Sequence, residues 1–292
     1  MFDIQFENVC VTFGETEALK NINLHLEGGK IYGLIGRNGA GKTTLLSLLA
    51  SYREPDSGKI TVNGQKPFEN PEIMPEITFI YEKDYSDESE KVKGLLDAAE
   101  RYRPRFDRKY AEELLTRLGI PLDKPAKSLS KGKKAALNVT LGLANRTEVT
   151  IFDEAYLGMD APTREIFYRA LMEDYTDHPR TFILSTHLVS EMDYLFEEVV
   201  ILHKGQILLK EPVEELLEQA RAVTGTREKV NEFISDMKVL ETQELGGVKR
   251  AVMYGKLSEE KMKKAEQLEL EFETISLQDL FIHLTSEANP DA

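Results

Sequence analysis

Gly36-Arg37-Asn38-Gly39-Ala40-Gly41-Lys42-Thr43 is the stretch that decides the fold of this chain. It fits the pattern G-x-x-x-x-G-K-[ST] and lies between a short apolar run at 31–35 and an apolar segment of helical spacing at 44–50. A glycine-rich turn from a strand into a helix points backbone N–H groups and the positive end of the helix dipole at one place. The stretch therefore predicts a loop that binds the phosphates of a nucleotide.

Two side chains of this loop have predicted chemical roles. We expect Lys42 to reach the terminal phosphates and the Thr43 hydroxyl to ligate Mg²⁺. The small residues Gly39 to Gly41 let the backbone approach phosphate without clashes from side chains. The nucleotide contacts that we expect are Gly36, Arg37, Asn38, Gly39, Ala40, Gly41, Lys42, Thr43 and Thr44.

Outside the loop, the first 210 residues predict an α/β fold. Apolar runs at 149–152 and 181–184 flank a helical segment, which is the rhythm of strands in a parallel sheet. Alternating apolar residues near 4–13 and 22–26 indicate N-terminal strands. From about 86 to 145 the strand signals vanish and helical spacing dominates, so we expect a helical insert there.

Two acids end one of these predicted parallel strands. Asp153 and Glu154 follow the apolar run Val149-Thr150-Ile151-Phe152. Ligands of open parallel sheets bind at the carboxyl ends of strands, so Asp153 is placed to hold Mg²⁺ and Glu154 to orient an attacking water. The alternative is that the two acids merely cap the end of a strand.

The tail at 211–292 predicts a separate small domain. Its pattern indicates strand, helix, two strands joined at Gly246-Gly247, helix and strand, which is the order of a ferredoxin-like unit. This tail holds 10 Lys and Arg against 18 Asp and Glu, so it carries −8 of the formal net charge of −14. A solvated acidic surface is the simplest interpretation.

The composition excludes several classes of function. A net charge of −14 argues against a broad nucleic-acid-binding face, and no apolar run is long enough to enter a membrane. A single cysteine cannot form an internal disulfide, which fits a reducing compartment.

Further motifs occur along the chain in a fixed order, and with them residues 2–210 resemble the ATP-binding cassette (ABC) ATPases, the nucleotide-binding subunits of ABC transporters. The resemblance implies a P-loop cassette with a RecA-like parallel-sheet core, an N-terminal antiparallel β-subdomain and a helical subdomain at about 86–145. The motifs that carry it, besides the phosphate loop and the acids, are Phe13-Gly14, Ser128-Leu129-Ser130-Lys131-Gly132-Lys133-Lys134, Gly158-Met159-Asp160 and Ser185-Thr186-His187.

The resemblance also implies roles for single residues. Phe13 would stack on the adenine of ATP. Ser130 and Gly132 would start a helix that faces the γ-phosphate of an ATP bound to a second cassette. His187 would contact that γ-phosphate, and Glu154, His187 and Lys42 would be the catalytic residues. The cofactors implied are ATP and Mg²⁺.

The same resemblance implies partners and a location. Each ATP would be enclosed by two cassettes, so the active form would be a homodimer or a heterodimer with a paralogue. A separate transmembrane permease would be contacted through the helical subdomain. The chain would then be cytoplasmic, peripheral at the inner face of the cell membrane, with no nucleic-acid partner and no direct membrane insertion.

Two motifs depart from the family pattern. In the signature Leu-Ser-Gly-Gly-Gln, Lys131 and Lys133 replace Gly and Gln; the alternative interpretation is that Lys133 and Lys134 face solvent. After the strand at 77–81, Glu82 stands where the family places a glutamine that touches Mg²⁺. We expect Glu82 to join Thr43 and Asp153 as a metal ligand; the alternative is that it points away.

Three functions remain open on sequence alone. The first is a transporter motor, with export favoured because exporters often carry a short C-terminal extension that closes like Ser276-Leu277-Gln278-Asp279-Leu280-Phe281. The second is a non-transport ABC protein, although the long heptads or second cassette of such proteins are missing. The third is a regulatory cassette that binds ATP without turnover, against which Glu154 and His187 argue.

Overall fold

The computed structural model describes residues 1–286 and divides the chain into two compact units. Unit 1 comprises Met1–His187 and Leu202–Ile207, and unit 2 comprises Leu188–Ile201 and Leu208–Ala292. Unit 2 therefore takes in residues 188–201, which precede the boundary at 210 that the sequence suggests. Positions 287–292 of the expected C-terminal domain lie outside the described residues.

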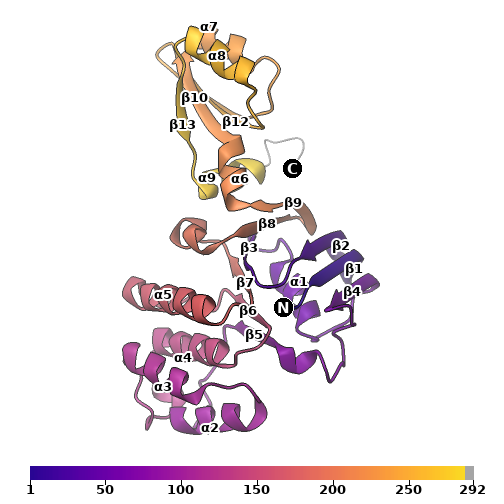
Figure 1. Ribbon diagram of the computed structural model, residues 1–292, viewed down its shortest axis with the longest axis vertical. Coiled ribbons are helices and arrows are strands. Elements are labelled where there is room, and N and C mark those ends of the chain that lie inside the picture. The colour runs from indigo at the N-terminus through magenta and orange to yellow at the C-terminus, as the bar shows by residue number, and fades with distance from the viewer. Residues whose placement is uncertain (287–292) are drawn as a thin grey trace. The chain divides into compact units, whose positions relative to one another are not determined.

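A six-stranded sheet forms the centre of the α/β part of the chain (Figure 1). Its order is β5-β6-β7-β3-β8-β9, and the pairs β5/β6, β6/β7 and β7/β3 are parallel. Strands β3 and β6 to β8 are buried along their whole length, as expected for a sheet covered on both faces. The bounds are β3 Ile31–Ile35, β5 Ile77–Tyr81, β6 Val149–Asp153, β7 Thr181–Thr186, β8 Glu198–His203 and β9 Gln206–Pro212.

The N-terminal strands make a separate antiparallel sheet, with the order β2-β1-β4. The strands are β1 Ile4–Phe13, β2 Thr16–Leu26 and β4 Ser57–Val62. In β1 the buried residues Ile4 and Phe6 are followed by Val9 and Val11, so the alternation shifts by one position. Asn8 has a φ of 50° where the register of both pairings shifts, and this bulge keeps both halves of the strand facing the core.

Five helices belong to unit 1: α1 Lys42–Leu49, α2 Val92–Tyr102, α3 Arg108–Arg117, α4 Lys131–Ala144 and α5 Ala161–Asp177. In Figure 1, α4 and α5 lie on one side of the central strands, and α1 and the antiparallel sheet lie on the other. Helix α4 approaches the sheet closely at Gly142, where an added Cβ would lie 2.7 Å from Ile80 and 2.8 Å from Phe152. The helical stretch expected at about 86–145 thus holds α2, α3 and α4, and the short 3₁₀ turn Ala126–Ser128 lies between α3 and α4.

A buried charge cluster ties α5 to the amino-terminal edge of the sheet. The carboxylate of Asp174 pairs with the guanidinium groups of Arg146 and Arg180, and its side chain is fully buried. Arg180 also donates to the carbonyl of Leu143 and lies over the ring of Phe182. Burial and the neighbouring Arg146 lower the pKa of Arg180 to about 10, so the Arg180 guanidinium remains charged at neutral pH.

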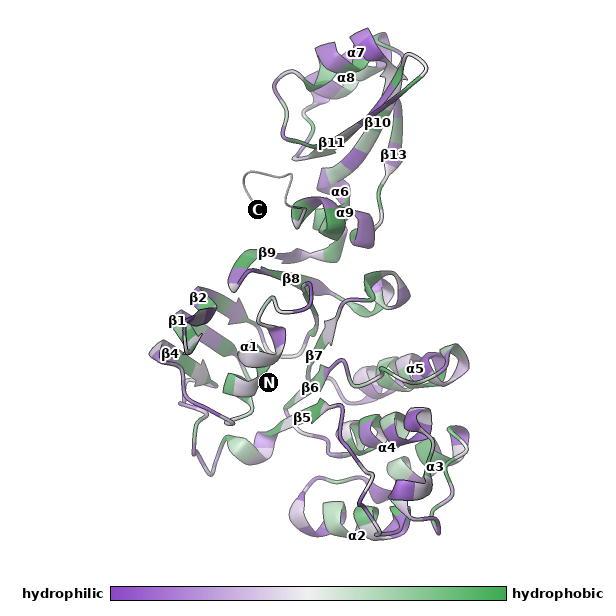
Figure 2. Cartoon of the chain, turned by 180° about the vertical axis from the view of Figure 1, so that it is seen from behind, coloured by the Kyte–Doolittle hydropathy of each residue, from purple (hydrophilic) through white to green (hydrophobic). Residues whose placement is uncertain are grey.

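In unit 2, the order βαββαβ predicted from the tail is confirmed. The sheet order β11-β12-β10-β13, with every neighbouring pair antiparallel, is that of a ferredoxin-like unit. Helices α7 and α8 carry apolar residues into a core with the sheet, including Val223, Phe233 and Met253. In Figure 2, α7 and α8 carry purple, hydrophilic segments beside green, hydrophobic ones. The bounds are β10 Ala220–Thr226, α7 Arg227–Ile234, β11 Val239–Leu245, β12 Val248–Tyr254, α8 Glu259–Gln267 and β13 Glu271–Thr274.

Two further helices flank this unit, α6 Val213–Gln219 and α9 Leu277–Leu284. Ser276 caps α9 by accepting a hydrogen bond from the backbone N–H of Asp279. Within residues 1–286, no helix combines the length and apolar character that a bilayer crossing requires.

Candidate functional site

The phosphate loop connects β3 to α1, as the sequence predicts. Its turn depends on glycine at two places: Gly39 and Gly41 have φ values of 79° and 107°. A Cβ added to Gly41 would lie 2.7 Å from the backbone oxygen of Ala18, and one added to Gly36 would lie 2.7 Å from that of Leu202. Neighbouring backbone atoms therefore leave no room for side chains at positions 36 and 41, and α1 begins at Lys42, directly after Gly41.

Lys42 is 6% exposed, and its ammonium group lies at the centre of the loop. It donates to the carbonyl oxygen of Gly36 at 2.7 Å and lies 3.4 Å from Oε1 of Glu154. A buried lysine needs anionic or carbonyl partners, and a triphosphate is a stronger partner than any of these. The position of Lys42 thus suits binding of a phosphate at the start of α1.

Thr43 and Asp153 meet although they are far apart in sequence. The Thr43 hydroxyl donates to Oδ2 of Asp153 at 2.7 Å, and Asp153 is buried. Oδ1 of the same carboxylate is buried without a hydrogen-bond partner. Such an orphaned oxygen beside a hydroxyl fits Mg²⁺, which takes one or two protein ligands and completes its shell with water and substrate phosphates.

Glu154 lies one residue beyond β6 and has a strained backbone, with a φ of 49°. Left-handed backbone is uncommon for a residue with a side chain, and it concentrates at functional sites. Oε1 of Glu154 lies 3.0 Å from Nδ1 of His187 as well as near Lys42. The structure therefore joins Lys42, Glu154 and His187, which are the three expected catalytic residues, in one contact group.

A cavity of about 680 Å³ opens over the loop. The expected residues that line it are Phe13, Asn38, Gly39, Ala40, Gly41, Lys42, Thr43, Thr44 and Glu154. Phe13 is 53% exposed, and the guanidinium of Arg53 lies 4.4 Å from the centre of its ring. An exposed aromatic ring at the rim of a phosphate site can stack on a nucleotide base.

The same cavity has a wall that the sequence did not predict. Lys20, Lys204 and Gly205 line it, together with Thr16, Glu17 and Ala18. The backbone of Gly205 accepts a hydrogen bond from the N–H of Lys20 and donates one to the carbonyl of Ala40. The turn between β8 and β9 is therefore hydrogen-bonded to the phosphate loop. Lys204 and Gly205 form the turn between β8 and β9, and nothing in the local pattern of these two residues places that turn beside residue 40.

The signature residues start α4, as expected. Ser130 is the N-cap of this helix, and its hydroxyl accepts from the N–H of Lys133. A Cβ added to Gly132 would lie 2.8 Å from the carbonyl oxygen of Gly158, so the signature packs on the loop that follows Glu154. Lys133 reaches the carbonyl oxygen of Gly119 at 2.8 Å.

The loop after Glu154 ends at Asp160, which caps helix α5. Asp160 accepts a hydrogen bond from the N–H of Thr163 at 3.0 Å. The hydroxyl and the N–H of Thr163 hold the pKa of Asp160 below its usual value, so this cap is ionised at neutral pH. The cap fixes the point at which the chain leaves the site and enters α5.

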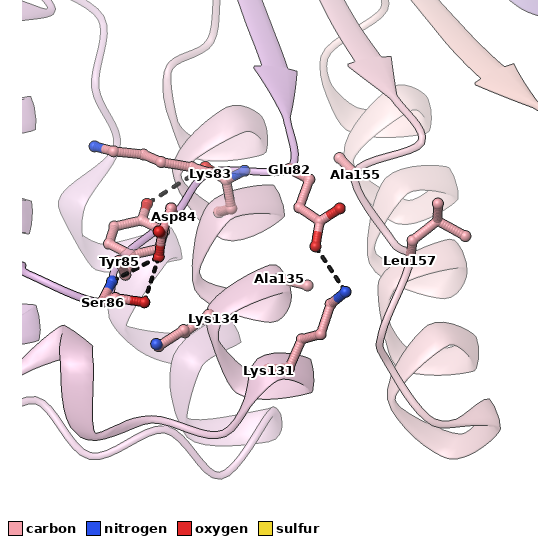
Figure 3. Close-up of a pocket in the computed structure, with 11 residues that line it drawn as sticks. Glu82, Lys83, Asp84, Tyr85, Ser86, Lys131, Lys134, Ala135, Ala155 and Leu157 are labelled. Atoms are coloured by element: carbon pink, nitrogen blue, oxygen red, sulfur yellow. Dashed lines mark hydrogen bonds and ion pairs between the residues drawn. The ribbon is translucent and has the colours of Figure 1, made fainter.

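Glu82 is placed differently from the expected metal ligand. Its Oε1 lies 2.7 Å from Nζ of Lys131, because the start of α4 offers a cation within hydrogen-bond distance. Both side chains line a second cavity of about 510 Å³, shown in Figure 3, which does not include Thr43 or Asp153. Among residues 1–286, no three His, Cys, Asp or Glu side chains form a group able to hold a metal.

Comparison with known proteins gives the same picture. A family model described as "ABC transporter" matches residues 19–157. The sulfate/thiosulfate import ATP-binding protein CysA of Chlorella vulgaris, named as probable, is 30% identical over 220 residues, which cover 70% of this chain and 89% of that protein. An uncharacterized ABC transporter ATP-binding protein of Methanocaldococcus jannaschii, MJ1023, is 27% identical over 285 residues, covering 96% of this chain and 98% of the relative.

A solved structure titled "Structure of ATP binding subunit of ABC transporter" superposes with a TM-score of 0.64 at 21% identity and covers 73% of this chain and 90% of its own. At that identity the superposition shows the fold alone, and the family follows from the sequence matches. With the phosphate loop, the acids of β6 and the α4 signature in one cassette, the chain belongs to the ATP-binding proteins of ABC transporters, a family of ATPases.

Proposed function

We propose that this protein is the motor subunit of an ABC transporter, in which ATP binding and hydrolysis drive a separate membrane permease. The observation that carries the proposal is the contact group of Lys42, Glu154 and His187 beside the phosphate loop. It brings a phosphate-binding cation, a carboxylate and an imidazole into mutual contact, and the first two line a single cavity. Those are the groups that in-line attack of water on a terminal phosphate needs.

Each residue of the site has one proposed task. Lys42 and the N–H groups of 36–44 bind the phosphates, and Phe13 stacks on adenine. Glu154 orients and polarises the attacking water, and His187 holds Glu154 and contacts the γ-phosphate. Thr43 and Asp153 hold Mg²⁺, which would neutralise phosphate charge when bound.

Turnover tests the hydrolytic role. Glu154→Gln in the full-length chain should lower the ATPase rate about 100-fold or more, while ATP affinity stays within a few-fold of the parent. Glu165→Gln, on the exposed face of α5, is the matched control and should leave the rate unchanged. Equal rates in the parent and Glu154→Gln would refute the hydrolytic role and favour a cassette that binds ATP without turnover.

We further propose that the active form is a dimer of cassettes, with this chain or a paralogue. Ser130 and Gly132 lie at the start of α4, where N–H groups and the helix dipole favour a phosphate. In this proposal they meet the ATP held by the opposite cassette. Glu154→Gln with ATP should therefore elute as a dimer in size-exclusion chromatography, and a monomer under saturating ATP would contradict it.

The permease is proposed to dock at the helical subdomain, about 86–145, and to hold the chain at the cytoplasmic face of the cell membrane. Residues 1–210 would then be the ATPase domain and 211–292 an accessory domain. Export is the proposed direction, and transport into inside-out vesicles rather than out of them tests it, since the named relatives include an import protein. A tagged full-length chain should recover a protein with several membrane spans from detergent extracts, and recovery of soluble proteins alone would contradict the docking.

A further inference from the structure

Two acids follow neighbouring strands at the edge of the site. In the parallel pair β5/β6, Tyr81 lies opposite Asp153, so Glu82 and Glu154 are the next residues on adjacent strands. Adjacent strands lie about 4.8 Å apart, which brings the two backbones close together. Two carboxylates from such positions repel each other, and both would repel a triphosphate.

The structure gives each of these acids its own basic partners. Glu154 contacts Lys42, which lines the phosphate cavity with it, and the His187 imidazole. Glu82 is held by Lys131, and this pair lines the other cavity (Figure 3). The two carboxylates are thereby directed to different partners, and the negative charge of Glu82 is compensated locally.

The reach of Lys131 to Glu82 depends on the loop after Glu154. A Cβ added to Gly158 would lie 3.0 Å from both Cγ and Cε of Lys131. The aliphatic stem of Lys131 therefore runs over a residue that has no side chain, and its ammonium emerges beside Glu82. Lys134 lines the same cavity, but in Figure 3 its ammonium points away from Glu82.

We propose that Lys131 is a positioning residue for ATP binding: it is the counter-ion that keeps Glu82 turned from the triphosphate of its own chain. Two of the positions at which the chain departs from the family pattern then compensate each other, an acid in place of a neutral glutamine at 82 and a cation in place of glycine at 131. The proposal rests on the proposed function of the phosphate loop as the ATP site, and it deepens that function by naming a residue that tunes affinity in cis.

The size of the effect follows from exposure. The Lys131 and Glu82 side chains are 69% and 60% exposed, so solvent screens the pair. Exposed ion pairs change an equilibrium constant by a few-fold at most, and we expect about two- to fivefold in ATP affinity. Because the pair is screened, the effect should shrink further as salt is added.

A double-mutant cycle with four full-length proteins tests the proposal: the parent, Lys131→Gln, Glu82→Gln and the double variant. Glutamine at 131 keeps the stem over Gly158 and removes only the charge. The primary readout is ATP affinity by equilibrium titration in EDTA, which needs neither Mg²⁺ nor turnover. Lys134→Gln is the matched control, three residues further along the same helix.

Lys131→Gln should weaken ATP binding about two- to fivefold at low salt, and Glu82→Gln should change it little. The double variant should return to the affinity of the parent, and Lys134→Gln should match the parent. If Lys131→Gln weakens binding equally with Glu82 or with glutamine at 82, Lys131 does not act through Glu82 and the proposal is overturned. No weakening in Lys131→Gln overturns it as well.

The outcome is separable from that of the proposed function. If the parent binds ATP and Glu154→Gln lowers turnover, but the double-mutant cycle does not give the expected affinities, only the counter-ion role of Lys131 is rejected. Failure of the parent to bind ATP at all rejects the proposed function and the counter-ion role together. A circular dichroism spectrum and melting temperature equal to those of the parent show that each variant is folded.

Discussion

Replacement of Asp174 by asparagine tests the buried charge cluster at the base of the sheet. The carboxylate of Asp174 forms ion pairs with the guanidinium groups of Arg146 and Arg180. The Asp174 side chain is fully buried, and those of Arg146 and Arg180 are 13% and 5% exposed. Removing one partner of a buried pair leaves uncompensated charge, at a cost of about 3–5 kcal/mol. Since Arg146 keeps an ion pair with Asp107 and Arg180 keeps a carbonyl partner, we expect the lower end, about 3 kcal/mol.

The assay must report on the unit that holds Asp174. The chain has no tryptophan and folds as two units, so one spectroscopic unfolding curve would mix their transitions. Urea unfolding should be followed by far-UV circular dichroism and by release of a fluorescent ATP analogue. Release of the nucleotide reports on the unit with the phosphate loop.

The control variant is Glu165→Gln on the same helix. Glu165 pairs with Arg169 four residues on, with side chains 56% and 66% exposed. Such a pair contributes about 0.3–0.5 kcal/mol, so the control should shift the free energy of unfolding by less than a fifth of the Asp174→Asn shift. If both variants cost the same small amount, the Asp174 carboxylate is not the buried counter-ion that the contacts indicate.

Three further changes have expected outcomes. Gly142→Ala should lower the free energy of unfolding by about 1–2 kcal/mol in the same urea assay, because its Cβ would meet Ile80 and Phe152 at 2.7 and 2.8 Å; an unchanged midpoint would show that α4 can move away. Asp153→Asn should raise the Mg²⁺ concentration for half-maximal ATPase activity about 10-fold or more and leave ATP affinity in EDTA nearly unchanged; an unchanged Mg²⁺ requirement would argue against Asp153 as a ligand. Burial raises the pKa of Tyr85 to about 12, so the contribution of Tyr85 to stability is complete below pH 10 and is lost as pH rises through 12. Between pH 9 and 11 the free energy of unfolding of the parent should fall by about 1 kcal/mol more than that of Tyr85→Phe, and equal decreases would contradict this.

The sequence predicted the parts of the site that follow from strand order. The phosphate loop, the Asp153-Glu154 pair and His187 each follow an apolar run, and parallel strands bring their carboxyl ends to one edge. The prediction that these residues lie close together therefore requires only that the strands form a parallel sheet. The tail was predictable for a similar reason, because the Gly246-Gly247 turn and the capping residue Ser258 mark the ends of its elements.

Other features depend on three-dimensional register, which a local pattern does not contain. The strand expected near 22–26 extends from Thr16 to Leu26, because β1 supplies partners as far as Phe13. The turn at Lys204-Gly205 contacts Ala40, and this contact depends on the order of strands in the sheet. The partner of Glu82 was missed because Lys131 is 49 positions further along the chain and on a helix.

Sheet order also explains where this cassette tolerates departures from the family pattern. Strand β7 lies between β6 and β3, so Thr43 and Asp153 meet across the end of β7, from which His187 extends. Each of these three strands has a neighbouring strand on both sides. Strand β5 is the edge of the sheet, and the residue after it is flanked by β6 on one side only. An acid at position 82 can therefore turn to a cation from α4, and we infer that the cation at 131 is needed only while an acid occupies position 82.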